Sequence, residues 1–300
     1  MDAGIIGVGA MGRNHVRVYS ELKNVGRVSI FDLNGAAARE LGRMHGAEVC
    51  TSVEELLARS DAVSVCVPTQ FHAETVRKVF AAKRSVLIEK PICATAAEAE
   101  ALMRTAPQGI TVGVGHIERF NPVVSEIKKI VKEPLYVEMK RHNPASARVT
   151  GSTVVEDLMI HDIDILLHLF GAPSALHSAG NDDVCSVLLK YGKFLAALSA
   201  SRKASKKIRM IYIEEEGFTI EGDFMSQEVT IYRKPGQYQF EAERYVQENI
   251  IEKVMVNKLE PLKRELATFV ECATEQKPFP ITPEQAIANL KLCEAIRAGL

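Results

Sequence analysis

The sequence lacks an excess of charge of either sign. Its 300 residues contain 37 Lys and Arg against 38 Asp and Glu, which gives a formal net charge of -1. Without surplus positive charge, the chain has no overall electrostatic attraction for a nucleic-acid backbone or an anionic membrane. We therefore expect neither nucleic acid nor a membrane surface among its partners.

Long apolar runs are also missing. No stretch reaches the roughly 18 residues that a membrane-spanning helix requires, and the start carries Asp2 and glycines rather than a basic segment with a cleavage site. We expect a cytoplasmic protein. A hydrophobic content of 47% with 25% charged residues is typical of a globular chain, and the length suggests about two domains.

Paired cysteine motifs, internal repeats and low-complexity segments are absent as well. The six cysteines show no CxxC spacing and no companion histidine cluster, and small secreted domains use cysteine far more densely. We expect reduced structural thiols and no metal site. The residues concerned are Cys50, Cys66, Cys93, Cys185, Cys272 and Cys293.

The first part of the chain alternates short apolar, β-branched runs with helical stretches. Such alternation predicts βαβ units that build a parallel sheet buried on both faces. The pattern changes after Asn121-Pro122, so we place a first domain at 1–118. The predicted strands are 4–7, 28–31, 62–67, 86–89 and 110–114, with helices at 73–83 and 96–105 among them.

The remainder, 119–300, is predicted to form a second α/β domain with an open, mostly antiparallel sheet. An exposed sheet face needs covering, so we expect this domain to bind substrate and also to form a homodimer or homotetramer. The predicted helices are 123–131, 154–170, 261–275 and 283–298, and the predicted strands are 135–141, 176–180, 184–190, 194–201, 208–213, 218–221, 228–232 and 238–243.

A glycine-rich motif, Gly7-Val8-Gly9-Ala10-Met11-Gly12, follows the first predicted strand directly and opens a helix. Gly7 permits a tight turn, Gly9 removes the Cβ that would block a pyrophosphate, and Gly12 lets the helix approach the strand. Free N–H groups and the positive end of the helix then meet the phosphates. This position predicts a dinucleotide site.

Asp32 ends the second predicted strand about 20 residues beyond Gly12. A carboxylate there can accept hydrogen bonds from both ribose hydroxyls and would repel a 2′-phosphate. No arginine follows immediately, so the sequence favours NAD over NADP. The alternative is that Asp32 merely caps the next helix.

Lys90 stands at the carboxyl end of a predicted strand, on the sheet edge where open parallel sheets bind ligands. A lysine there can donate a hydrogen bond to a substrate hydroxyl, or act as a base if its surroundings remove its proton. A surface lysine before a turn is the alternative.

Asp157, His161, Asp164 and His168 recur at i, i+4, i+7 and i+11 of one predicted helix. An Asp four residues before a His can fix the tautomer of a general base. The alternatives are a solvated polar face or, less consistent with the seven-residue spacing of the histidines, a metal site.

Together these motifs resemble the Gfo/Idh/MocA oxidoreductase family over nearly the whole chain. The resemblance implies a Rossmann domain, a second domain with an open sheet, and NAD(P)-dependent oxidation of sugars or polyols. Lys90 then occupies the family's catalytic lysine position, and Asp157 and His161 match its downstream Asp and His. The segments that carry the resemblance are the glycine motif, Val67-Pro68-Thr69-Gln70-Phe71-His72-Ala73-Glu74, Glu89-Lys90-Pro91 and the Asp157–His161 pair.

Within that family, residues 115–122 and 157–164 look like the branch that oxidises UDP-N-acetylglucosamine at C3. The alternatives are a dehydrogenase of a free sugar or a cyclic polyol such as inositol, and a non-catalytic NAD-binding regulator. A diphosphate needs positive or N–H donors. Candidates for contacts with the substrate are Lys90, Arg119, Asn121, Arg141, Asp157 and His161, with Arg148 and the run 202–207 as further sources of charge.

The resemblance also implies a mechanism. A sugar carbon gives a hydride to nicotinamide while His161 removes the hydroxyl proton, Asp157 orients His161 and Lys90 binds the same hydroxyl; the roles of Lys90 and His161 could be exchanged. We expect the loop at 144–153 to order over substrate. Thr69, Gln70 and His72 are expected beside the nicotinamide, His72 with the alternative of a helix-start residue only, and Pro68 and Glu89 are expected among the other cofactor contacts.

Overall fold

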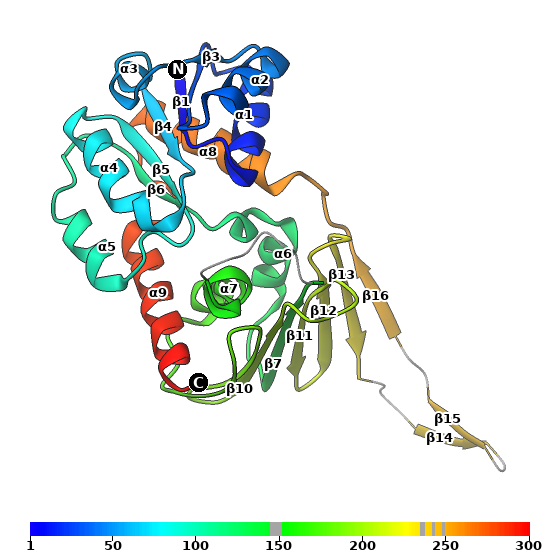
Figure 1. Ribbon diagram of the computed structural model, residues 1–300. Coiled ribbons are helices and arrows are strands. Elements are labelled where there is room, and N and C mark those ends of the chain that lie inside the picture. Colours follow the sequence, from blue (N-terminus) through cyan, green and yellow to red (C-terminus); the bar gives the residue numbers. More distant parts are fainter. Residues whose placement is uncertain (145–151, 235–237, 242–243, 248–249) are drawn as a thin grey trace. The chain divides into compact units, whose positions relative to one another are not determined.

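A computed structural model describes residues 1–144, 152–234, 238–241, 244–247 and 250–300. The chain forms two compact units, and each is described by itself (Figure 1). The first comprises Met1–Ile117 with Glu260–Lys291, and the second comprises Glu118–Leu259 with Leu292–Leu300.

The first unit is built on a parallel six-stranded sheet in the order β3-β2-β1-β4-β5-β6. Strands β1 and β4 are buried along their whole length, as expected for strands covered on both faces. This strand order is that of dinucleotide-binding folds, with the switch point beside β1. The strands are β1 (Ala3–Ile6), β2 (Val28–Phe31), β3 (Glu48–Val49), β4 (Ala62–Val65), β5 (Ser85–Glu89) and β6 (Val112–Gly115).

Helices accompany this sheet, and local sequence explains several of their starts. The side chains of Asn34, Ser52 and Thr95 each accept a hydrogen bond from a backbone N–H in the first turn that follows. The helices are α1 (Ala10–Glu21), α2 (Gly35–His45), α3 (Val53–Ala58), α4 (His72–Ala81), α5 (Ala96–Met103) and α8 (Pro261–Glu275), and α9 (Pro283–Ala298) belongs to this unit as far as Lys291.

The division of the chain differs from the expected boundary, because residues 260–291 group with the first unit rather than with 119–259. The reason lies in packing against β6. A Cβ on Gly113 would lie 2.5 Å from the ring of Phe279, and the Thr111 hydroxyl donates to the carbonyl of Lys277 at 3.0 Å. No local feature in the sequence of α8 indicates that the chain packs against the first unit again.

The second unit holds an eight-stranded sheet in the order β16-β13-β12-β11-β7-β10-β9-β8. Among the described strands, neighbours are antiparallel except β7 and β10, which confirms the expected open, mostly antiparallel sheet. The strands are β7 (Tyr136–His142), β8 (Ala175–Gly180), β9 (Val184–Lys190), β10 (Leu195–Ser201), β11 (Ile208–Glu215), β12 (Phe218–Asp223), β13 (Glu228–Arg233) and β16 (Ile250–Val254).

One face of this sheet is covered by helices α6 (Pro122–Ile130) and α7 (Ile160–Phe170) (Figure 1). A Cβ on Gly222 of β12 would lie 2.9 Å from Val123 and 3.0 Å from Ile127, so α6 packs closely on the strand. Alternate residues of β9 are buried and exposed, as expected for a sheet covered on one side. The exposed side chains on the outer face include apolar ones, such as Leu188 and Leu195.

Some local expectations were wrong. The expected helix at 154–170 begins with a π-helix, Val155–Met159, and only then continues as α7. The expected strand at 238–243 is β14 (Tyr238–Glu241), which pairs with β15 (Arg244–Gln247) in a separate two-stranded sheet and not with the eight-stranded sheet. Strands β3, β15 and β16 were not predicted.

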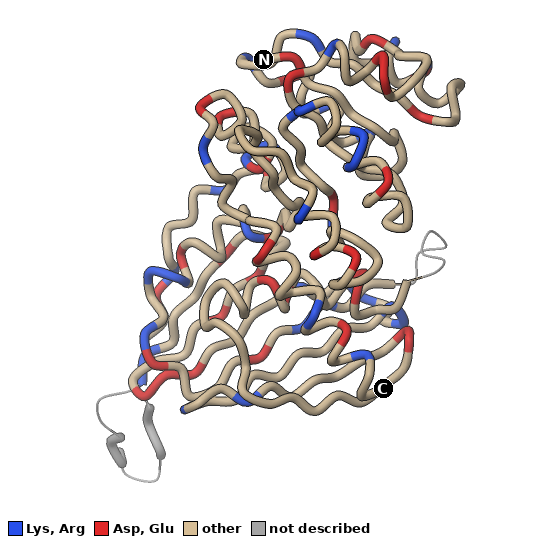
Figure 2. Tube along the Cα trace, turned by 90° about the vertical axis from the view of Figure 1, so that its left-hand side faces the viewer, with Lys and Arg blue, Asp and Glu red and all other residues tan. Residues whose placement is uncertain are grey.

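Charged residues of both signs are interspersed along the chain trace (Figure 2). Both units therefore contain acidic and basic residues, and neither unit is predominantly acidic or basic. Within the part of the chain that is described, no helix combines the length and apolar character needed to span a membrane.

Candidate active site

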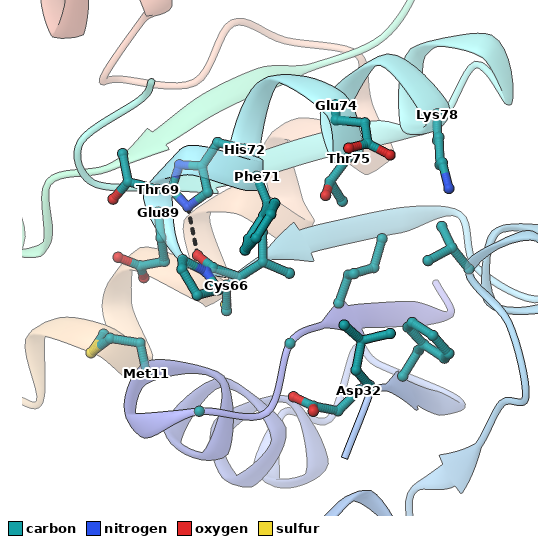
Figure 3. Close-up of a pocket in the computed structure, with 18 of the residues that line it drawn as sticks. Met11, Asp32, Cys66, Thr69, Phe71, His72, Glu74, Thr75, Lys78 and Glu89 are labelled. Carbon is teal, nitrogen blue, oxygen red and sulfur yellow. Dashed lines mark hydrogen bonds between the residues drawn. The ribbon is translucent and has the colours of Figure 1, made fainter. Parts of the chain in front are cut away.

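A pocket of about 940 Å³ lies in the first unit, at the carboxyl ends of β1, β2, β4 and β5 (Figure 3). This is the edge at which open parallel sheets bind ligands. Its lining includes these residues that the sequence assigned to a cofactor: Gly7, Gly9, Ala10, Met11, Asp32, Pro68, Thr69, His72, Glu89 and Lys90.

The glycine motif forms the floor of this pocket. Gly7 has φ +92°, and a Cβ on Gly12 would lie 1.9 Å from the Gly7 carbonyl oxygen, so α1 can start only with glycine at both positions. A Cβ on Gly9 would meet nothing within 4 Å. Open space thus lies beside Gly9 at the start of α1, and the pocket fits a dinucleotide pyrophosphate there.

Asp32 lies in the pocket at the end of β2. Its Oδ2 accepts a hydrogen bond from the Val8 N–H at 2.7 Å, and its Oδ1 accepts one from the Asn34 N–H at 2.7 Å. Asn34, not Asp32, is the N-cap of α2, because the Asn34 side chain accepts from the Ala37 N–H. The capping alternative for Asp32 is therefore wrong.

Other lining residues were not singled out from the sequence. Leu33, which is 95% exposed, Thr51 and Glu54 line the pocket. Thr75 and Lys78 of α4 line it as well (Figure 3). No motif marks these positions. Their only signal is that they follow β2 and β3 or lie on the helix after β4, next to the ligand-binding edge.

His72 begins α4 and is buried. Its Nε2 lies 2.8 Å from the Val67 carbonyl and its Nδ1 lies 3.0 Å from the Pro91 carbonyl. Burial lowers the pKa of this imidazole, so the neutral ring donates to one of the two carbonyls. His72 thus joins the turn after β4 to the turn that carries Lys90, which goes beyond a helix-start role.

The second unit carries Asp157 in the π-helix and His161 at the start of α7. Oδ2 of Asp157 pairs with Nε of Arg202 at 3.4 Å, and Arg202 also donates to the Thr153 carbonyl at 2.7 Å. Arg202 therefore links Asp157 to the Thr153 backbone, whereas Lys203 of the same run is exposed. An approach of Lys90 to His161 remains a prediction.

Arg119, Arg141 and Asn121, which the sequence offers as substrate contacts, each have partners within the second unit. Arg141, 1% exposed, donates to Asp162 at 2.7 Å and to Glu118 at 3.0 Å. The Arg119 side chain is 7% exposed and makes a bidentate pair with Asp164 at 2.8 and 2.5 Å. The Asn121 side chain caps α6 and donates to the Phe224 carbonyl. A contact of any of the three with substrate stays a prediction.

The expected polar stripe of α7 is consequently not a solvated face. Asp164 is buried against Arg119, whose Nη1 donates to Nδ1 of His168 at 3.1 Å. Burial, together with the charges of Arg119 and Lys128, lowers the pKa of His168 to about 4. His168 is therefore neutral near pH 7. Arg148 and most of the loop at 144–153 lie outside the described residues.

Comparison with known proteins identifies the family to which the chain belongs. A family model described as an oxidoreductase family with an NAD-binding Rossmann fold, Gfo/Idh/MocA, matches residues 1–116. UDP-N-acetylglucosamine 3-dehydrogenase of Acidithiobacillus ferrooxidans is 31% identical over 244 residues, which cover 78% of this chain and 77% of that protein. Inositol 2-dehydrogenase of Rhizobium meliloti is 28% identical over 228 residues, covering 67% and 69%.

Solved structures are similar over the whole length. The structure of the Acidithiobacillus ferrooxidans enzyme GnnA superposes with a TM-score of 0.89 at 27% identity, covering 100% of this chain and 97% of that one. Levoglucosan dehydrogenase in complex with NADH and levoglucosan gives a TM-score of 0.85 at 18% identity, covering 100% and 96%, and shows the shared fold alone.

Proposed function

Because this chain belongs to the Gfo/Idh/MocA oxidoreductases, an NAD-binding family, we propose that it oxidises the C3 hydroxyl of UDP-N-acetylglucosamine to a ketone. The observation that carries the proposal is the 31% identity to a UDP-N-acetylglucosamine 3-dehydrogenase, which extends over 78% of this chain. The similarity thus reaches beyond the cofactor-binding part into the part proposed to bind substrate.

The pocket residues are proposed to hold NAD, which supplies a hydride acceptor when bound. The open side of Gly9 and the first N–H groups of α1 would meet the pyrophosphate, and Asp32 would accept from the adenosine ribose. Pro68 and Thr69, in the turn after β4, would lie beside the nicotinamide. His72 would hold that turn in place through the Val67 carbonyl.

The proton chemistry is assigned to Lys90, His161 and Asp157. We propose that His161 removes the proton of the hydroxyl that is oxidised, and that Asp157 orients the His161 imidazole. The ammonium of Lys90 would donate a hydrogen bond to the same oxygen and hold it at the right place for hydride transfer. Arg202, paired with Asp157 at 3.4 Å, would fix the orientation of that carboxylate.

A free sugar or cyclic polyol is the second candidate substrate. The relatives include inositol 2-dehydrogenases, one of them 28% identical over 67% of this chain. Arg119 and Arg141 also pair with Asp164 and Asp162, so part of their charge is already neutralised and less of it is left for a diphosphate. A non-catalytic regulator receives no such support, because these relatives are named as dehydrogenases.

Product identification tests the proposal. Purified protein is incubated with NAD and separately with UDP-N-acetylglucosamine, UDP-glucose, glucose and inositol, and the products are analysed by mass spectrometry. We expect a product two mass units lighter from UDP-N-acetylglucosamine. Oxidation of inositol or glucose alone would replace the nucleotide-sugar assignment with the second candidate. Absorbance of NADH on the protein itself is recorded in parallel, since a cofactor that stays bound would give no free NADH.

The outer face of the eight-stranded sheet is proposed to bind a second copy of the chain. Its exposed apolar side chains would leave water on pairing, which favours association. Light scattering after gel filtration is expected to give at least a dimer, and Leu188→Lys is expected to weaken its association. The exposed apolar residues on this face include Val184, Leu188, Leu195, Tyr232 and Ile251.

A further inference from the structure

A buried polar pair lies directly beneath the turn that carries Lys90. Nε2 of His15, on α1, lies 2.7 Å from Oε1 of Glu89, the last residue of β5. His15 is 0% exposed and Glu89 is 6% exposed. Burying an unpaired carboxylate costs folding free energy, and the contact with His15 offsets that cost.

The second oxygen of the same carboxylate reaches the backbone of the candidate catalytic residue. Oε2 of Glu89 accepts a hydrogen bond from the Lys90 N–H at 3.2 Å. His15 lies three residues after Gly12 on the helix that begins at the glycine motif. Glu89 therefore connects two segments of the pocket, the glycine-rich turn through α1 and the Lys90 turn.

The surroundings are shaped to hold a carboxylate. A Cβ on Gly115 of β6 would lie 3.2 Å from the Glu89 carboxyl group, so a glycine leaves the room that the group needs. The thiol of Cys66 lies with His15 and Glu89 in a cluster whose ligand-type atoms are all within 4.8 Å of one another. Burial raises the pKa of this thiol well above its usual value, so it stays neutral.

Glu89 is ionised in this cluster. Burial acts to raise its pKa, but the His15 hydrogen bond and the charges of His15 and Lys90 lower it below the usual value. Tyr19 from α1 and His72 from α4 also interact with the Glu89 charge, and the charge of Glu265, buried on α8, acts on Tyr19 and Cys66. Burial raises the pKa of Tyr19 and lowers that of His72, so both are neutral near pH 7.

We propose that Glu89, held in place by His15, is a positioning residue that fixes the backbone at Lys90 and supplies the negative charge that keeps its ammonium protonated. The inference rests on the proposed function, in which Lys90 donates to the substrate hydroxyl. It assigns His15 and Glu89 a role that requires no contact with the substrate. The attraction between Glu89 and Lys90 is mutual, so removing the carboxylate charge removes a reason for the lysine to stay charged.

The test compares Glu89→Gln and Glu89→Asp with the wild-type chain. Lysines are reductively methylated with ¹³C, Lys90 is assigned by its loss in Lys90→Arg, and its titration is followed by NMR. The Lys90 titration midpoint is expected to fall by about half a pH unit or more in Glu89→Gln and to be largely kept in Glu89→Asp. We also expect kcat to fall about tenfold in Glu89→Gln with little change in KM, because alignment and not binding is lost.

A matched control is Thr111→Val, which removes another buried hydrogen-bonding group of the first unit. It is expected to lower stability without moving the Lys90 titration. An equal midpoint in Glu89→Gln and wild type would overturn the proposal. If Glu89→Gln does not fold, His15→Asn replaces it: faster exchange of the Lys90 amide hydrogen supports the proposal, and unchanged exchange overturns it.

Both NMR measurements are made without sugar. A wild-type chain that oxidises no sugar would therefore contradict the proposed function while leaving the Lys90 titration to be judged separately.

Discussion

The backbone N–H of Val8 donates a 2.7 Å hydrogen bond to Oδ2 of Asp32, which joins the glycine-rich turn to the end of β2. The other oxygen of the same carboxylate accepts from the Asn34 N–H, so the group is held from both sides at the pocket wall. A carboxylate fixed by backbone donors keeps its remaining lone pairs in a defined direction, as recognition of two ribose hydroxyls requires.

Asp32→Ala is expected to weaken NAD binding about tenfold, which corresponds to about 1.4 kcal/mol. It should also narrow the preference for NAD over NADP, because the negative charge that repels a 2′-phosphate is gone. Dissociation constants for both cofactors, measured by calorimetry, check this. Asp61→Ala removes an exposed carboxylate that likewise accepts a backbone N–H at 2.8 Å, and it should change neither constant.

Gly9→Ala is expected to reduce NAD affinity at least about tenfold while leaving the fold intact. The added methyl would meet nothing within 4 Å in the protein, and Gly9 has φ -66°, which alanine adopts readily. It would instead occupy the space proposed for the pyrophosphate. Thermal unfolding and NAD titration are measured together, with Gly192→Ala, another position with open space, as the control. Unchanged affinity would place the phosphates elsewhere.

Acid sensitivity is expected from His168. Its pKa is lowered from 6.5 to about 4, so the unfolded chain takes up this proton at higher pH than the folded chain. The contribution to the free energy of unfolding is therefore fully present above about pH 6.5 and is lost as the pH falls toward 4. Urea unfolding from pH 7 to pH 4.5 should show a flatter pH dependence in His168→Asn than in wild type. The exposed His177→Asn is the control, and an equal slope in both variants would contradict the assignment.

Arg141→Met is expected to lower the free energy of unfolding of the second unit by about 3–5 kcal/mol. The change leaves Asp162 and Glu118 buried without their cation, although the side-chain volume is nearly kept. Arg59→Met removes an exposed arginine that also has two carboxylate partners and should cost at most about 1 kcal/mol. Equal decreases in the free energy of unfolding for the two variants would show that the buried ion pairs of Arg141 stabilise the unit no more than the exposed pairs of Arg59.

The local motifs were predictable from sequence because their causes are local. Buried parallel strands must be apolar runs, and a turn such as that at Gly7 must use glycine, so β1, α1 and the pocket floor follow from a dozen residues. Strand β3 was missed because it has two residues, both exposed. The π-helix at Val155–Met159 was missed because its apolar pattern is that of an ordinary helix.

The partners of charged side chains were not predictable. Arg141 meets carboxylates 21 and 23 residues away, and His15 meets Glu89 at a separation of 74. Spacing along one helix assigned His168 to a stripe with His161, but its neighbour in space is Arg119, 49 residues earlier. Residue types and their spacing thus predicted which side chains can take part in catalysis or binding. Only the fold shows which of the charged ones are already paired with one another.

Transfer of deuterium from substrate to cofactor tests the proposed reaction most directly. UDP-N-acetylglucosamine carrying deuterium at C3 is incubated with NAD and stoichiometric protein, and the cofactor is extracted and analysed by mass spectrometry, with Lys90→Met as the inactive control. We predict NADH one mass unit heavier than normal and a sugar nucleotide that has lost the label. Oxidation with NADH at its ordinary mass, or no oxidation while unlabelled inositol is oxidised, would contradict it.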